Sequence, residues 1–160
     1  MGQLNKTGMR ELTSDMADYE GYITCNYYTG YSRVVGQKSD KLSDDSIPSY
    51  EAFEESFKQN KAVDHQFGCF ELVYDNEDGK VVAYADIQHD KKNHTVAILV
   101  FIVAQDYQLK GYGRKFYQAI EEEARKKGVR RITVNTAAYG AIKFWHKMGF
   151  YGNGFLAKNI

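Results

Sequence analysis

The stretch QLKGYGRKFYQAIEEEARKKG, residues 108–128, places two glycines at the start of an amphipathic helix. Gly111 and Gly113 stand one residue apart, although each glycine in a helix interior costs about 1 kcal/mol relative to alanine. Glycines at a helix start fit either a tight turn packed closely on a sheet or a backbone that an anion approaches. The helix is expected to end at Gly128. Its apolar face is predicted to be Tyr112, Phe116, Ala119, Ile120 and Ala124, with Glu121, Glu122, Arg125 and Lys126 facing water.

The residues before this helix predict an antiparallel sheet. FGCFELVYD (67–75) and KVVAYADIQHD (80–90) are strand-like runs, and NEDG (76–79) between them contains an Asp-Gly pair that favours a tight hairpin turn. The next run, TVAILVFIVA (95–104), is apolar on both faces. Such a run predicts a central strand that is covered on both sides.

The residues after the helix predict a further strand, helix and strand. RITVNT (131–136) is strand-like, AYGAIKFWHKMG (138–149) has helical spacing, and FYGNGFLAKNI (150–160) reads as a terminal strand with glycine breaks. The first third of the chain favours helices, with a helical pattern over residues 49–59, and it is rich in tyrosine.

Composition excludes several classes of protein. The 160 residues suit one domain, and a formal net charge of zero argues against a nucleic-acid-binding surface. No apolar run approaches the roughly 20 residues of a membrane span, so we expect no membrane partner and a cytoplasmic protein. Cys25 and Cys69 lie far apart with no metal-binding spacing beside them, so we expect no metal. The charges divide into an acidic run over residues 40–55 and a basic run over residues 110–131.

Three patterns around the glycines resemble those of the GNAT superfamily of acetyl-CoA-dependent N-acetyltransferases. The pattern Q/R-x-x-G-x-G/A is matched by Gln108, Gly111 and Gly113, and V-x-x-x-x-Q/R is matched by residues 103–108. Residues 141–150 match A-x-x-x-Y-x-x-x-G-F, with tryptophan in the tyrosine position. The resemblance spans about residues 68–155, with the motifs in the family's order.

This resemblance implies an α/β fold, with a mixed, mostly antiparallel sheet of about six or seven strands flanked by about four helices. One splayed pair of strands would hold acetyl-CoA. Residues 1–160 would form a single domain, with 1–66 as a helix-rich acceptor side and 67–160 as the acetyl-CoA-binding core. The resemblance also admits a homodimer.

The family's cofactor-binding positions carry over to three segments. Backbone groups of the splayed strand would bind the pantetheine arm, and amides at the helix start would bind the pyrophosphate. Asn135 resembles a position that bonds the pantetheine, although capping the next helix is its ordinary role. The predicted cofactor-binding residues are Phe101, Ile102, Val103, Gln108, Leu109, Lys110, Gly111, Tyr112, Gly113, Arg114, Asn135, Ala138 and Trp145.

The catalytic groups are less evident in the sequence. An indole N–H is a poor proton source, so Trp145 does not replace the family's tyrosine acid, and packing the last helix on the sheet is its ordinary role. Tyr139 or Tyr151 is the candidate acid, unless the thiolate leaves without protonation. Asp86, His89 and Glu71 are candidate bases, and His89 is expected on the opposite face of the same strand as Asp86.

The expected reaction moves an acetyl group from acetyl-CoA to a primary amine of a small molecule or protein. The acidic run and the tyrosine cluster of the first third would suit a cationic acceptor, because aromatic faces attract ammonium groups. A solvated acidic helix and core-packing tyrosines are the plainer interpretation of the same residues. The replaced tyrosine also leaves open a non-catalytic acyl-CoA-binding sensor or interaction module.

Overall fold

The hairpin predicted from NEDG lies in the sheet between β2 (Phe67–Asp75) and β3 (Val81–Asp90). The Asn76 N–H donates to the Lys80 carbonyl at 2.9 Å, and Gly79 has the left-handed φ of +75°. The Asn76 side-chain oxygen also accepts from the backbone N–H of Asp78 and Lys80. The turn therefore forms as its sequence predicts, with glycine at the position that needs positive φ.

The computed structural model describes residues 8–27, 47–62, 67–134, 139–152 and 155–160. Six strands of this part form one sheet in chain order, in which β4 and β5 run parallel and all other neighbours antiparallel. The remaining elements are β1 (Gly8–Glu11), α1 (Met16–Tyr27), α3 (Tyr50–Ala62), β4 (Thr95–Val103), the 3-10 turn η2 (Gln105–Tyr107), α4 (Tyr112–Lys126), β5 (Arg131–Val134), α5 (Tyr139–Lys147) and β6 (Leu156–Asn159).

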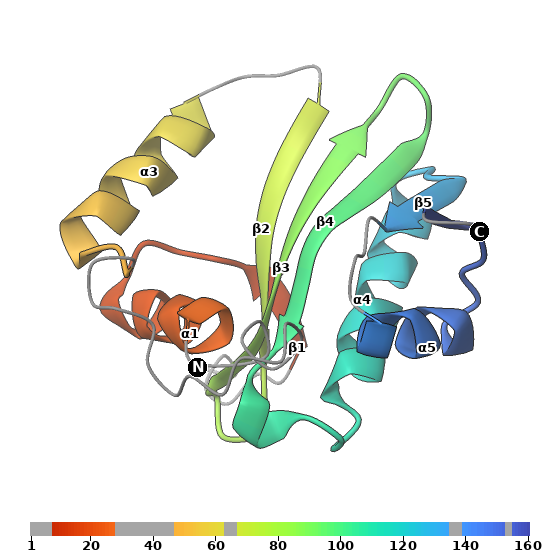
Figure 1. The fold of residues 1–160 in the computed structure, drawn as a ribbon. Helices are drawn as coiled ribbons and strands as arrows, with labels where there is room; N and C mark the ends of the chain where they lie inside the picture. The colour runs from red at the N-terminus through yellow and green to blue at the C-terminus, as the bar shows by residue number, and fades with distance from the viewer. Residues whose placement is uncertain (1–7, 28–46, 63–66, 135–138, 153–154) are drawn as a thin grey trace.

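The helices cover both faces of the sheet (Figure 1). Helices α1 and α3 lie on one face, and α4 and α5 lie on the other. The apolar run of β4 is accordingly a strand in the interior of the sheet, as predicted. Strand β1 was not predicted, because its four residues, GMRE, carry no alternating pattern.

Strand β4 contains a bulge that changes which residues face which helices. Ile98 pairs with Ile87 but Val100 pairs with Asp86, so Leu99 is an extra residue. Ile98 packs toward α4, whereas after the bulge Phe101 packs there. The residues of β4 that face α4 therefore have even numbers before the bulge and odd numbers after it.

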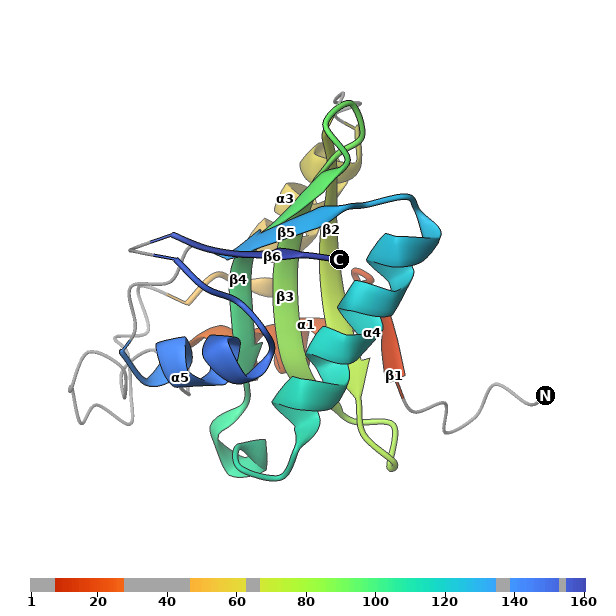
Figure 2. The same ribbon diagram turned by 90° about the vertical axis from the view of Figure 1, so that its right-hand side faces the viewer.

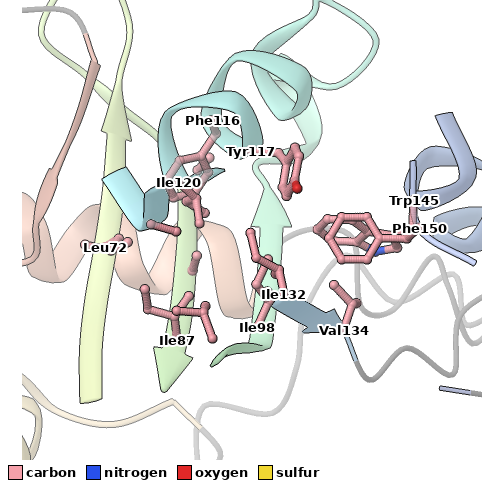
Figure 3. Packing of buried hydrophobic residues seen from close by; sticks show 14 of the residues in the cluster. Leu72, Ile87, Ile98, Phe116, Tyr117, Ile120, Ile132, Val134, Trp145 and Phe150 are labelled. Atoms are coloured by element: carbon pink, nitrogen blue, oxygen red, sulfur yellow. The ribbon is translucent and has the colours of Figure 1, made fainter. Parts of the chain in front are cut away.

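The larger core lies between the sheet and α4 with α5 (Figure 3). Phe116, Tyr117 and Ile120 of α4 are each at most 2% exposed. Tyr117 was not on the predicted face, and the prediction that Glu121 faces water is wrong. The Glu121 carboxylate accepts the Tyr117 hydroxyl at 2.8 Å and pairs with Arg125 and with Lys158 of β6, which ties the helix to the last strand.

The smaller core lies between the sheet and α1 with α3, and tyrosines build much of it. The Tyr22 ring meets Tyr84 of β3 edge-on at 5.0 Å and Phe53 of α3 at 5.3 Å. The Tyr19 hydroxyl donates to the Pro48 carbonyl at 2.6 Å. These tyrosines therefore pack the core, which agrees with the plainer interpretation of the tyrosine cluster. Tyr28, Tyr31 and residues 40–46 of the acidic run lie outside the described residues.

Candidate functional site

Strand β4 continues well past the point where its pairing with β5 stops. The parallel ladder joins residues 95–98 to residues 131–134, while β4 extends to Val103. Figure 2 shows β5 and β6 crossing at a steep angle to β4 as the strands diverge. The last five residues of β4 thus have no ladder partner on their β5 side in the described part of the chain.

The register of the β3–β4 ladder shows which backbone groups of β4 face its unpaired side. The Ala104 N–H donates to the Val82 carbonyl at 2.8 Å, which makes residues 104 and 82 a hydrogen-bonded pair. Because hydrogen-bonded and non-bonded pairs alternate in an antiparallel ladder, Ile102 is also bonded to β3. The N–H groups of Phe101 and Val103 therefore point away from β3, toward the β5 side.

Gln108 ties the following loop to the end of β4. Its side-chain Nε2 donates to the Val103 carbonyl at 2.9 Å, and its backbone N–H bonds the Gln105 carbonyl across the 3-10 turn. A glutamine five residues after Val103 can reach back in this way because η2 folds the chain tightly. The spacing V-x-x-x-x-Q thus has a structural basis in this chain.

The two glycines at the start of α4 serve different purposes. Gly111 caps the helix with a φ of +88°, and a Cβ there would meet no described atom within 4 Å. A Cβ at Gly113 would lie 3.2 Å from Phe144 and 3.5 Å from Val103. A side chain at Gly113 would therefore press on Phe144 of α5, whereas Gly111 leaves the backbone accessible from outside.

The N-terminus of α4 offers backbone donors and positive charge together. The first intrahelical bond runs from the Lys115 N–H to the Gly111 carbonyl at 3.2 Å, so the N–H groups of the first turn have no intrahelical acceptor. Within the described ranges, no side chain caps the helix and no acidic residue occupies its first turn. The Lys110 ammonium lies 5.6 Å from the Tyr107 ring centre, and Arg114 is exposed. This end of the helix is suited to bind an anion.

Aromatic side chains of α4 and α5 pack against the unpaired end of β4. Phe101 stacks on Phe116 and Phe144, and meets Trp145 edge-on at 5.0 Å. Trp145 is 2% exposed and also contacts Tyr117. Trp145 therefore packs α5 onto the sheet, in agreement with its ordinary role.

Two carboxylates lie on the other face of the sheet, toward α1 and α3. Glu71 and Asp86 are directly opposite each other on β2 and β3, and the Tyr84 hydroxyl donates to Glu71 at 3.0 Å. Burial, and then repulsion by Glu71, raise the pKa of Asp86 to about 6. Val100 of β4 is the next residue in this cross-strand row. Asp86 is thus one strand away from the divergent end of β4.

A cavity of about 340 Å³ adjoins Glu71. Its walls come from α1, α3 and β2, and Glu71 is the charged residue among them. The pKa of Tyr22 in its wall is raised to about 12, chiefly by burial. The lining residues are Tyr22, Tyr27, Pro48, Ala52, Phe53, Ser56, Phe57 and Glu71.

The remaining predicted site residues lie in separate parts of the chain. Tyr139 begins α5, Asn135 and Ala138 lie outside the described residues, and Leu109 and Tyr112 lie at the loop and first turn of α4. The Tyr112 hydroxyl donates to Glu77 at 2.7 Å. His89 faces a separate cavity of about 330 Å³ beside the C-terminal half of α4, so it does not join Asp86 and Glu71.

Sequence reasoning missed the contribution of Tyr84 to the acidic pair and the bulge at Leu99 that sets the facing of Phe101. The Tyr84 hydroxyl was detectable in principle, because it lies on the same strand face as Asp86. The bulge carries no signal in an entirely apolar run.

The described residues contain neither a membrane-spanning helix nor a metal-binding cluster. No described helix combines the length and apolar character that crossing a bilayer requires. No cluster of three or more His, Cys, Asp or Glu side chains in the described ranges is arranged to hold a metal ion.

Comparisons with known proteins agree with this geometry. The model of the Acetyltransferase (GNAT) family matches residues 37–150. The structure of the PaiA N-acetyltransferase from Thermoplasma acidophilum, in complex with coenzyme A, superposes with a TM-score of 0.68 at 15% identity, over 97% of this chain and 99% of that chain.

Two further solved structures are similar over most of their length. The ribosomal-protein-alanine N-acetyltransferase from Brucella melitensis has a TM-score of 0.66 at 18% identity, over 95% of this chain and 99% of that chain. An acetyltransferase from Thermus thermophilus has a TM-score of 0.64 at 18% identity, over 99% and 100% of the two chains. At these identities the likeness concerns the fold. No curated protein sequence matches this chain.

Proposed function

Because this chain belongs to the GNAT acetyltransferase family, we propose that it transfers the acetyl group of acetyl-CoA to a primary amine by direct attack. The observation that carries the proposal is the divergence of β4 from β5 after residue 98, beside a helix N-terminus with outward N–H groups. An acyl carrier with a long arm and a diphosphate needs both features. Residues 67–160 supply them, and residues 1–66 form the acceptor side of one domain.

The cofactor side follows from the backbone geometry. The pantetheine arm lies along β4 at residues 101–103, and the N–H of Phe101 or Val103 polarises the thioester carbonyl. The diphosphate lies on the N–H groups at the start of α4, with Lys110 and Arg114 adding positive charge.

The acceptor enters from the opposite face of the sheet, where α1 and α3 pack. The cavity walled by Tyr22 and Phe53 has aromatic faces and the carboxylate of Glu71. These groups suit an amine that arrives as a cation. An apolar or anionic acceptor would gain nothing from Glu71 and Asp86.

Asp86 is the proposed proton acceptor. An ammonium group must lose one proton before it attacks, and a carboxylate whose pKa is about 6 stays mostly ionised at pH 7 while binding a proton more readily than an ordinary aspartate. The neutral amine then forms a bond to the thioester carbon, and the carbon–sulfur bond breaks. The amine nitrogen gives its second proton to solvent as the amide forms, and the thiolate leaves as such or takes a proton from Tyr139, which solvent then reprotonates.

A second function is favoured by one observation. Trp145 occupies the family's tyrosine position and is 2% exposed, so it supplies no acid. A protein that binds acetyl-CoA without turnover would act as a sensor or interaction module. The two functions share the binding site and differ only in catalysis.

The test combines binding with turnover. Calorimetry measures acetyl-CoA affinity, and colorimetric detection of free thiol measures transfer across polyamines, aminoglycosides, amino acids and lysine peptides. The transferase proposal predicts binding and thiol release with at least one cationic amine, strongly reduced in Asp86→Asn. Glu122→Gln, an exposed charge removed from α4, is the control and should match the wild type. Binding without release across the panel would favour the sensor.

A further inference from the structure

The cavity of about 330 Å³ beside α4 lies between the C-terminal half of that helix and strands β1 to β4. Figure 2 shows α4 crossing the sheet obliquely, from the end of β4 at its start toward β2 and β1 at its later turns. The cavity is therefore apart from the start of α4, and the function proposed above uses none of its residues. The apolar part of its wall includes Phe70, Leu72, Ile87, Val96 and Ile120.

His89 is the buried polar side chain in this wall. It is 6% exposed, and its neighbours across the sheet are Gly68 of β2 and Val96 of β4. No described residue hydrogen-bonds its imidazole, and neither ring nitrogen is fully enclosed by the described residues. A buried polar group without a partner is unfavourable unless something in the cavity supplies the hydrogen bond. A cavity of this size admits a molecule much larger than water.

Lys127 brings a positive charge to the same cavity. Its ammonium lies 4.7 Å from the centre of the Phe70 ring. Arg125 and Lys126 each pair with the glutamate one helical turn earlier. Lys127 has Glu123 at the same spacing, but in the described part of the chain it forms no ion pair with a carboxylate. The Lys127 ammonium thus lies over the aromatic wall of the cavity rather than on its neighbouring glutamate.

The charges around the cavity favour an anionic head group. Burial, and then the charge of Lys127, hold the pKa of His89 below its usual value, so the imidazole is neutral at pH 7 and still donates one N–H. Arg10 in the same wall is held by two aspartates. The acidic residues of the wall, Glu11 and Glu123, are exposed. The buried donor and the nearby ammonium therefore set the preference of the interior.

We propose that this cavity is a second ligand site, which binds a small apolar carboxylate. The His89 N–H and the Lys127 ammonium hold the carboxylate, and the apolar wall covers the rest of the ligand. Burial of the apolar body supplies affinity, and the charge-assisted hydrogen bond to Lys127 selects the anion. An amine with the same body would instead bring a second positive charge to Lys127. The site is independent of acetyl-CoA binding and of the proposed function.

The experiment titrates the wild type with hexanoate, 1-hexanol and hexylamine, which share one apolar chain and differ in the charge of the head group. Methyl NMR gives the affinity and the position of each ligand together. Hexanoate should bind saturably, with a dissociation constant on the order of 1 mM. It should shift the methyl signals of Ile87 and Ile120 but not that of Ile23, which lies on α1 on the other face of the sheet.

Three variants test the two donors. Lys127→Gln and His89→Leu should each weaken hexanoate binding about fivefold and leave hexanol binding unchanged. Lys126→Gln, which removes the neighbouring charge outside the cavity wall, is the control and should bind hexanoate as the wild type does. Thermal unfolding checks that each variant is folded, and Lys127→Gln, at an exposed position, decides the question if His89→Leu does not fold.

Four results would overturn the proposal. The wild type might show no saturable binding of hexanoate, or equal affinity for all three ligands, which would indicate an apolar cavity without anion recognition. Hexanoate that shifts Ile23 but neither Ile87 nor Ile120 would lie elsewhere in the protein. Unchanged hexanoate affinity in folded Lys127→Gln would remove the ammonium from the site.

Discussion

Replacing Asp86 by asparagine should make the protein more stable at pH 8. The pKa of Asp86 is raised from 3.8 to about 6, first because burial disfavours the charged form and second because Glu71 is opposite. The pKa of Asp86 is higher in the folded than in the unfolded protein, so the charged carboxylate lowers the free energy of unfolding. This loss of stability is absent below about pH 4, grows between about pH 4 and pH 6, and is complete above about pH 6. Asparagine carries no charge and avoids this penalty.

The size of the effect follows from the shift. A difference of about two pKa units corresponds to about 3 kcal/mol of unfolding free energy. Because the side chain is only partly buried, solvent screening reduces this to about 1 kcal/mol. For a domain of this size, the melting temperature should rise by about 3 °C.

The assay is thermal unfolding at pH 8 and pH 4 for the wild type, Asp86→Asn and the exposed control Glu122→Gln. Asp86→Asn should gain stability at pH 8, and most of that gain should vanish at pH 4, where the wild-type carboxyl is protonated when folded. The control should change little at either pH. A gain of equal size at both pH values, or none at pH 8, would refute the conclusion that Asp86 is charged in a desolvating site.

Three other substitutions test separate parts of the structure. Gln108→Ala removes the bond to the Val103 carbonyl, so urea unfolding should show a loss of about 1 kcal/mol and calorimetry a weaker affinity for acetyl-CoA; unchanged values in both would contradict that role. Gly113→Leu should crowd Phe144 and destabilise by about 1–3 kcal/mol in the same unfolding assay, and a stable variant would show that the helices separate easily. Glu71→Gln removes a repulsive charge, so the acid limb of the kcat/KM profile should move to lower pH if Asp86 is the base, and a limb that stays in place would argue against it.

Most of the architecture was predictable because its signals are local. The Asp-Gly turn, the doubly apolar strand and the helix between Gly111 and Gly128 each follow from short-range patterns. Strand β1 was not predictable, since GMRE gains strand structure only by pairing with β2. The exposure of Glu121 was predicted wrongly for the same reason, because its ion pair with Lys158 of the last strand holds the carboxylate at the edge of the core.

The site was predictable where a motif fixes the backbone and unpredictable where distant strands meet. Gln108 and the two glycines are adjacent in sequence, so their joint position could be anticipated. The opposition of Glu71 and Asp86 depends on the β2–β3 register, and the facing of Phe101 depends on the bulge at Leu99. Neither is specified by residues close in sequence.

The central claim is that the divergent end of β4 and the start of α4 together bind acetyl-CoA for transfer to an amine. The most direct measurement is calorimetric binding of acetyl-CoA, followed by thiol release from the same sample on addition of each amine class. We expect saturable binding of acetyl-CoA and thiol release with a cationic amine. Absence of acetyl-CoA binding would contradict it outright, whatever the amine.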